Sequence, residues 1–524
     1  MMVDLNRRRK TPLHDQIRAQ IGRLIGEGIL PPDARLPGTR EMARLLHVSR
    51  NTVLRAYDEL VADGCLKVIP RKGIFVESGC RLRGAPPARP AAAVTTGFNA
   101  FNAWTELLSR QGSRAEFLEG LNPSEDARPD LIRFTGEPVL EDESWVERLR
   151  AAFRDVLARE GTRLLGYAPA QGYEPFREFL VERLRRHGIR SASLQGLLVV
   201  NGFREGLSLL TQTLIEPGDP VVTEDPTYPA ALDILRYAGA RIVGIPVDDE
   251  GMRIDCLEAQ LQQLQPKFVY TIPTHHNPTG TTLSHTRRQQ LLELCARHRV
   301  LIVEDLFSDE LLCGGCFVVP LHAMAEPGQV LSIGTFSKVI CPALRVGWVA
   351  GPPELVRRLT VAKAITDSFT NTISQAAIVE YASQGYLDPH LTTARREYRA
   401  RRDRLAALLP EFLPPGSHWP LTEAHLSVWV RLPEGGSNGA VSSAAASARF
   451  GVAFREGARC YVNGGGGNHL GLSVMSVTLP RIRPGLERLA AYLGQEYLKE
   501  GRGRWRRSPG GTGAKAGDFD ASAS

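Results

Sequence analysis

Long apolar runs are missing from this 524-residue chain. No stretch approaches the ~20 apolar residues that a membrane-spanning helix needs. The amino terminus, MMVDLNRRRK, lacks the apolar core of a secretion signal, so we expect a cytoplasmic protein. Cysteine is scarce as well: 8 residues lie scattered along the chain, which excludes a disulfide framework. The close pair Cys313 and Cys316 has no second Cys or His pair at zinc-finger spacing, and no metal site is predicted.

Net charge is nearly absent from the middle of the chain, although the whole carries a formal charge of +7. Residues 1–80 hold 14 Lys and Arg against 9 Asp and Glu, and residues 499–524 hold 6 against 3. The chain is long enough for at least two hydrophobic cores. A basic small domain joined to a near-neutral large one suggests a nucleic acid as partner of the first and a small molecule as ligand of the second.

Residues 1–78 carry the pattern of a small helical domain that ends in a hairpin. Apolar residues recur at helical spacing after residue 11, Ser49 is a good N-cap and Gly64 a good helix end. The predicted elements are a helix within residues 11–28, helices at Thr39–Leu46 and Arg50–Asp63, and a hairpin of Leu66–Ile69 and Ile74–Glu77. This order, with a basic hairpin tip, indicates a winged helix-turn-helix.

The same segment carries three short motifs: Pro12-Leu13, Leu36-Pro37-Gly38-Thr39-Arg40 and Val48-Ser49-Arg50-Asn51-Thr52-Val53. It resembles the DNA-binding domain of the GntR family over the whole module. Side chains near the start of the recognition helix are expected to reach bases and phosphates: Arg40, Ser49, Arg50, Asn51 and Thr52. Further phosphate contacts are expected from Arg55, Arg71 and Lys72. For Arg44 and Lys67, solvation of the domain surface is the alternative interpretation.

Beyond residue 78 the chain changes character twice. Residues 79–129, rich in Pro and Ala, are predicted to be a linker, and residues 499–524 a disordered basic tail. Between them, residues 130–498 alternate apolar runs with helical stretches. The predicted strands are Gly196–Val200, Pro220–Thr223, Phe268–Ile272, Val300–Glu304 and Val330–Ile333. Such alternation predicts an α/β domain with a mainly parallel sheet.

The segment from Gly334 to Trp348 places Lys338 directly after Thr335 and Ser337 and seven residues before Arg345. A lysine amine can form a Schiff base with an aldehyde, while hydroxyls and a forked guanidinium suit a phosphate. Pyridoxal phosphate carries both groups. We therefore predict that this segment binds pyridoxal 5'-phosphate.

Four further motifs follow predicted strands, where ligands of open α/β sheets bind. The backbone N–H groups of Phe203 and Arg204 begin a helix and can bind phosphate. The ring of Tyr228 can stack on a pyridine, and the Asn277 amide can donate to its phenolate oxygen. Asp305 ends a strand, where a carboxylate can hold the pyridine nitrogen protonated.

In this order the motifs resemble those of fold-type I aminotransferases. Joined to the GntR-like domain, the chain is similar to the MocR subfamily of transcriptional regulators. The resemblance implies Lys338 as the Schiff-base lysine, with the other residues named above around the cofactor. It also implies a homodimer in which Tyr167 is donated to the partner's site.

Two residues usual in aminotransferases are missing. A tyrosine commonly follows the ring-nitrogen aspartate, but Asp305 is followed by Leu306, Phe307 and Ser308. An arginine commonly binds the substrate carboxylate where this chain has Gly471. An unpaired carboxylate in a partly buried site costs ~2–5 kcal/mol, so ordinary amino-acid transamination is expected to be impaired.

Three hypotheses follow from these motifs. The first is a DNA-binding regulator that senses a small amine or amino-acid-like effector at a bound pyridoxal phosphate. The second is an active aminotransferase with an accessory DNA-binding domain. In the third, pyridoxal phosphate is itself the effector of the regulator.

Overall fold

The computed structural model describes residues 5, 11–26, 30–70, 73–77, 108–115, 128–136, 140–307, 318–420, 426–434 and 441–497. The chain divides into two compact units, Met1–Leu107 and Leu108–Ser524. The predicted linker and tail, and the basic residues Arg71 and Lys72 of the hairpin tip, lie largely or wholly outside the described residues. No helix in the described part of the chain is both long and apolar enough to cross a membrane.

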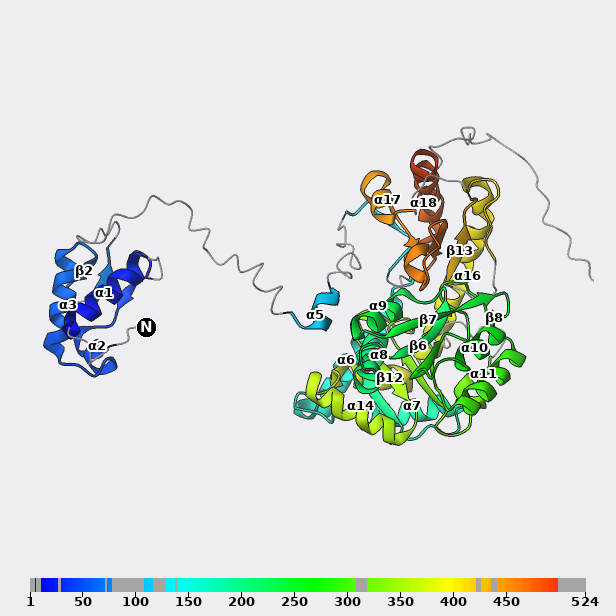
Figure 1. The fold of residues 1–524 in the computed structure, drawn as a ribbon, viewed down its shortest axis with the longest axis horizontal. Helices are drawn as coiled ribbons and strands as arrows, with labels where there is room; N and C mark the ends of the chain where they lie inside the picture. The colour runs from blue at the N-terminus through cyan, green and yellow to red at the C-terminus, as the bar shows by residue number, and fades with distance from the viewer. Residues whose placement is uncertain are drawn as a thin grey trace, which may run out of the picture. The chain divides into compact units, whose positions relative to one another are not determined.

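The first unit is a winged helix-turn-helix (Figure 1). Its elements are α1 (Leu13–Gly26), β1 (Arg35–Leu36), α2 (Thr39–Leu45), α3 (Arg50–Ala62), β2 (Leu66–Ile69) and β3 (Gly73–Val76). Ile17, Ile21, Val53 and Leu60 form its core and are completely buried. The Ser49 hydroxyl accepts from the Thr52 N–H at 3.1 Å and so caps α3.

Most predicted elements of this unit are confirmed to within one residue. The sequence did not predict β1, whose two residues pair with β3 and extend the hairpin into a three-stranded sheet in the order β1-β3-β2. A two-residue strand is too short to show an alternating apolar pattern, and only its hydrogen bonds to the neighbouring strand identify it.

The second unit contains an eight-stranded sheet in the order β5-β12-β11-β10-β9-β6-β7-β8. All neighbouring strands are parallel except the pairs made by β12 and β8. The strands are β5 (Leu197–Val200), β6 (Pro220–Asp225), β7 (Arg241–Asp248), β8 (Gly251–Met252), β9 (Phe268–Thr271), β10 (Leu301–Asp305), β11 (Val330–Thr335) and β12 (Gly347–Ala350). The predicted mainly parallel α/β sheet is confirmed.

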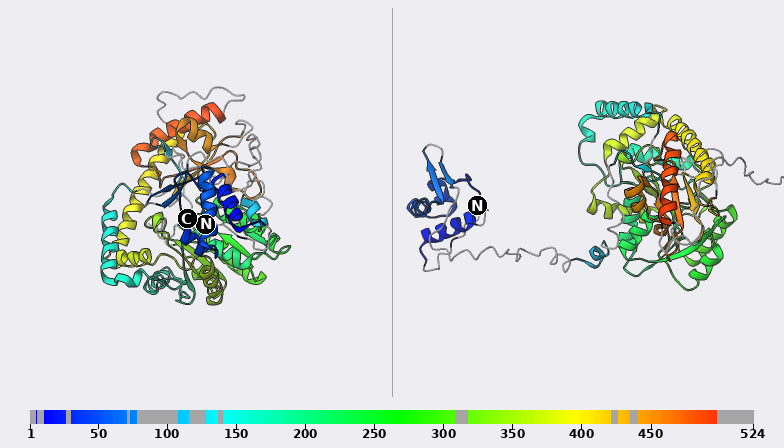
Figure 2. Two further views of the ribbon diagram at one scale, coloured as in Figure 1. Left: turned by 90° about the vertical axis from the view of Figure 1, so that its left-hand side faces the viewer. Right: turned by 90° about the horizontal axis from the view of Figure 1, so that it is seen from above.

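Successive strand residues pack on opposite faces of this sheet. Val221 and Tyr270 pack among residues of the helices α8, α9 and α14, whereas Val222 and Val269 pack among residues of α10 and α11. The helices around the sheet are α6 (Ser144–Glu160), α7 (Glu174–Arg186), α8 (Phe203–Leu214), α9 (Pro229–Ala238), α10 (Ile254–Leu261), α11 (His285–His298), α13 (Leu321–Met324), α14 (Pro353–Thr366) and α15 (Thr372–Ser383). Helices surround the sheet in both views of Figure 2.

A smaller sheet in the order β13-β16-β15 follows in the chain. Its strands are β13 (Ser427–Arg431), β15 (Arg455–Glu456) and β16 (His469–Ser473), accompanied by α16 (Leu387–Phe412), α17 (Ser443–Phe450), the 3-10 helix η4 (Gly457–Cys460) and α18 (Leu479–Tyr492). Two short strands, β4 (Ile132–Arg133) and β14 (Val452–Ala453), pair in parallel, and α5 (Arg110–Arg114) lies beside α9. In Figure 1, α17 and α18 lie at the opposite end of this unit from α7 and α14.

Candidate functional site

The predicted DNA-contacting residues in the described part of the first unit lie at the start of α3 and on α2. Arg40, Ser49, Arg50 and Asn51 are exposed, so their side chains are accessible to DNA. Thr52 is half-buried, and its hydroxyl lies 2.8 Å from that of Ser49.

Two further basic residues of this unit are engaged in ion pairs. Arg55 is exposed and pairs with Glu59 at 3.3 Å. Lys67 pairs with Asp33 at 2.7 Å, and its assignment to solvation of the domain stays a prediction.

In the second unit, the predicted phosphate-binding residues gather at the start of α8. Gly202 precedes this helix with φ of 84°, and a Cβ built on it would lie 3.3 Å from an Nη atom of Arg345. The Arg345 guanidinium donates to the Asn201 carbonyl at 2.6 Å. The first N–H groups of a helix have no partner inside it, so those of Phe203 and Arg204 are suited to an anion beside Arg345.

Thr335 ends β11 and lies opposite Gly347 of β12. Its hydroxyl accepts from the Ser337 N–H at 3.1 Å and thereby shapes the turn that carries Lys338. A Cβ on Gly347 would lie only 2.7 Å from Cα of Gly202, so glycine is required where the two segments approach. This approach brings the start of α8 next to the segment that carries Lys338 and Arg345.

An ion-pair cluster around one buried lysine supports the start of α8. Lys363 on α14 is completely buried, and its Nζ lies 2.8 Å from Glu205 and 2.6 Å from Asp367. Glu205 accepts from the Asn201 N–H, and Asp367 accepts from the Asn201 amide at 2.6 Å. Because both sides of Asn201 are held, the carbonyl that binds Arg345 is fixed as well.

Asp305 lies at the end of β10 and is 2% exposed. Its carboxylate accepts from the Tyr270 hydroxyl at 2.7 Å and from the Phe307 N–H at 3.0 Å. Burial raises the pKa of Asp305 to about 7, although both hydrogen bonds oppose the rise. No cation lies within ion-pair distance of Asp305 in the described part of the chain.

Aromatic rings connect Asp305 to the start of α8. Burial and the adjacent carboxylate hold the pKa of Tyr270 far above its usual value, so its hydroxyl keeps its proton and donates. The ring of Phe203 lies 6.2 Å from that of Tyr270 and 5.7 Å from that of Tyr228. Tyr228 precedes α9 and is half-buried, so its ring has an accessible side.

Asn277 lies in the loop after β9, and buried polar groups hold this loop. The Arg288 guanidinium donates to the Pro273 carbonyl at 2.6 Å and to the Thr274 hydroxyl at 2.8 Å. The His276 ring lies 3.5 Å from the carboxylate of Glu224. Arg455 of the smaller sheet donates from Nη1 to Oδ1 of Asn277.

The sequence profile of the aminotransferase class I and II family matches residues 135–485, and that of the gntR family of bacterial regulatory proteins matches residues 13–76. A probable rhizopine catabolism regulatory protein, MocR of Rhizobium meliloti, is 30% identical over 83% of this chain and 82% of its own length. The chain belongs to the MocR-type GntR regulators.

Enzymes resemble the second unit of this MocR-type chain. Aromatic-amino-acid aminotransferase 1 of Thermococcus litoralis is 36% identical over 71% of the chain and 89% of that protein. The α-aminoadipate aminotransferase LysN of Thermus thermophilus, solved with N-(5'-phosphopyridoxyl)-L-leucine, has a TM-score of 0.68 and 28% identity, covering 74% of the chain and 98% of LysN.

Pyridoxal 5'-phosphate is the cofactor of this MocR-type fold, and the site fits it. The Asp305 carboxylate is buried and has no cation partner among the described residues, which suits a protonated pyridine nitrogen, and the start of α8 with Arg345 suits a phosphate. When bound, the cofactor would supply an electron-withdrawing ring to an attached amine. The roles of the individual residues stay predictions: Lys338, Asp305, Asn277, Tyr228, Arg345, Thr335, Ser337, Phe203 and Arg204.

Tyr167 is set apart from the other predicted residues. Its side chain is 96% exposed, and its ring lies edge-on to that of Phe369, with the ring centroids 6.1 Å apart. The donation of Tyr167 to a partner's site stays a prediction.

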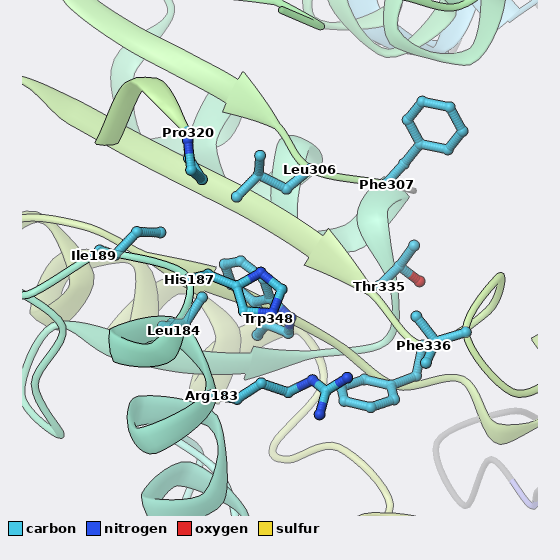
Figure 3. A pocket seen from close by; sticks show the side chains of 11 residues that line it. Arg183, Leu184, His187, Ile189, Leu306, Phe307, Pro320, Thr335, Phe336 and Trp348 are labelled. Atoms are coloured by element: carbon cyan, nitrogen blue, oxygen red, sulfur yellow. The ribbon is translucent and has the colours of Figure 1, made fainter. Parts of the chain in front are cut away.

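A separate cavity lies beside β11 and shares only Thr335 with the predicted site (Figure 3). Its lining is mostly apolar and includes Leu184, Ile189 and Trp348. The ring of Phe307 extends away from the other side chains in Figure 3. Ser308, the next residue, lies outside the described residues.

Sequence reasoning missed two residues of the site, Tyr270 and Arg455. Each is defined by a contact across strands, to Asp305 and to Asn277 respectively. All four residues of β9, Phe268–Thr271, are buried, so its pattern gives no reason to single out Tyr270. Arg455 lies 178 residues from its contact in the sequence, so no motif spacing could indicate it.

Proposed function

We propose that this MocR-type regulator binds promoter DNA as a homodimer and that a small-molecule effector, bound against pyridoxal phosphate at Lys338, changes its DNA binding. The strongest support is that one chain contains both an exposed start of the recognition helix α3 and a cofactor site. An enzyme has no need of the first unit, and a simple repressor has no need of the buried carboxylate at Asp305.

The homodimer is supported by apolar side chains left on the surface of the second unit. Leu165 is 65% exposed, Tyr167 is 96% exposed and Ile365 is 80% exposed. Large exposed apolar residues commonly mark protein interfaces. A partner subunit would bury Tyr167 and bring its hydroxyl to the partner's cofactor site.

The effector acts only if it binds two states of the dimer unequally. Lys338 would hold the cofactor, and an amine effector that took its place would release the lysine side chain and alter the turn after β11. Such a change, transmitted to the subunit interface, would alter the separation of the two DNA-binding domains, and therefore the half-site spacing that the dimer prefers.

The experiment is a parallel titration of the purified full-length protein with amino acids, amines and pyridoxal phosphate, read by cofactor absorbance and by gel shifts on its own upstream DNA. We expect specific binding relative to a scrambled sequence at the same salt concentration, and an effector-dependent shift. The Lys338→Ala variant should keep cofactor-free DNA binding and lose the effector response.

Two outcomes would overturn the proposal. Equal affinity for the upstream and scrambled DNA would remove the regulator function. Sustained turnover of an amino acid to its keto acid, without any effect on DNA binding, would favour the active aminotransferase. A response to pyridoxal phosphate alone would identify the cofactor as the effector.

A further inference from the structure

Arg455 and Gly471 are direct cross-strand neighbours in the smaller sheet. Gly471 on β16 pairs with Arg455 on β15 and with Trp429 on β13. Side chains of paired residues share one face of a sheet. A Cβ built on Gly471 would lie 3.3 Å from Arg455 Cβ and 3.5 Å from Trp429 Cε3. The Arg455 side chain therefore occupies the face that a side chain at position 471 would share.

This face is turned toward the predicted cofactor site. The Arg455 guanidinium reaches Oδ1 of Asn277, in the loop after β9 of the large sheet. A guanidinium has donors only, so the amide atom that faces it is the oxygen, and Nδ2 of Asn277 points elsewhere. The contact places a permanent positive charge beside the amide predicted to bind the ring oxygen.

No carboxylate of the described residues forms an ion pair with Arg455. Within the described residues its side-chain hydrogen bond goes to Asn277, a neutral group, and its side chain is only half-buried. The neighbouring Arg459, by contrast, lies 3.5 Å from a carboxylate oxygen of Asp233. A half-buried guanidinium beside a ligand site, held by one neutral acceptor, is suited to bind a carboxylate through its remaining N–H groups.

We propose that Arg455 binds the carboxylate of the effector, so that the ligand class is an α-amino acid rather than a simple amine. This inference rests on the proposed function and specifies its effector. Gly471 carries no side chain on the shared face, and Arg455 on the neighbouring strand β15 supplies the guanidinium instead. Arg455 thereby replaces the carboxylate-binding arginine that is missing at position 471.

The test compares two reduced probes that differ only in the carboxylate: N-(5'-phosphopyridoxyl)-L-leucine and N-(5'-phosphopyridoxyl)-3-methylbutylamine. Binding to cofactor-free full-length protein is measured by calorimetry, without DNA and without turnover. We expect the wild-type protein to bind the leucine probe about 10- to 100-fold more tightly, as for a charge-assisted hydrogen-bonded pair. The Arg455→Met variant should lose this preference while binding the amine probe within about threefold of wild type.

Two variants sharpen the comparison. Arg431→Met removes an exposed arginine from the same sheet and should leave both affinities unchanged. The double variant Arg455→Val with Gly471→Arg returns a guanidinium to the same face from the central strand and should regain part of the preference.

Equal losses for both probes in Arg455→Met would overturn the proposal, because Arg455 would then only orient Asn277. Equal affinities of the two probes for the wild-type protein would overturn it too. Neither result would test the DNA-binding function, which is measured separately with the upstream DNA.

Discussion

Replacing Asp305 with Asn should stabilise the cofactor-free protein and destabilise the cofactor-bound protein. The carboxylate is 2% exposed and has no cation partner among the described residues, so its ionisation in the folded state is unfavourable. Asn keeps the shape, and the Tyr270 hydroxyl can turn to accept from its amide. The bound cofactor supplies the missing positive charge, so its presence reverses the order of stability.

The magnitude follows from the pKa of Asp305, which burial raises from 3.8 to about 7. Between these values the folded protein binds a proton that the unfolded chain has lost, so stability falls as pH rises through this window. By pH 8 the raised pKa of Asp305 lowers the free energy of unfolding by ~4 kcal/mol, and near pH 4 the loss is below ~1 kcal/mol. Asp305→Asn, which cannot ionise, escapes this loss.

Urea unfolding of the cofactor-free protein between pH 5 and 8, followed by tryptophan fluorescence, measures the effect. All six tryptophans lie after residue 103, so the signal does not come from the DNA-binding domain. The exposed Asp249→Asn is the matched control and should show no pH-dependent difference from wild type. The reasoning fails if the advantage of Asp305→Asn does not grow with pH, or persists with cofactor bound.

Three further changes test other parts of the chain. Ser49→Ala removes the cap of α3 and should lower its stability by ~1 kcal/mol, seen as about fivefold faster amide exchange in that helix; unchanged exchange would contradict the cap's role. Arg55→Ala should weaken upstream and scrambled DNA alike and reduce the slope of log affinity against log salt by ~1; a sequence-selective loss would instead indicate base contact. Lys363→Met removes the cation between the half-buried Glu205 and the exposed Asp367 and should cost ~1–3 kcal/mol in urea unfolding; an unchanged stability would refute the pairing.

Local patterns were sufficient to predict most elements of the first unit and five of the eight strands of the large sheet, but not β7, β8 or β12. The strand at Val330–Thr335 and the helix at Arg50–Ala62 are set by apolar runs and capping residues that lie within a few positions of each other. The strand β12 at Gly347–Ala350 was not predicted, because it lies inside the segment that was interpreted for its Lys and Arg chemistry. Its antiparallel place between β5 and β11 depends on pairing alone.

The candidate site was predictable only where its residues end a strand or begin a helix. Asp305 and Phe203 occupy such positions, so topology brings them to one edge of the sheet. Tyr270, by contrast, acts by donating across to the next strand, and Arg455 acts from a different sheet. Contacts of this kind follow from strand register, which a single sequence does not specify.

The close approach of Gly202 to Gly347 suggests which parts of the site can change in sequence while the fold is kept. The predicted phosphate site consists of main-chain N–H groups at two closely approaching glycines, so it does not depend on the identity of most surrounding side chains. On the face that carries Arg455, by contrast, two substitutions on neighbouring strands, at positions 455 and 471, would move the positive charge. The choice of effector can therefore change through a few substitutions that leave the predicted phosphate site intact.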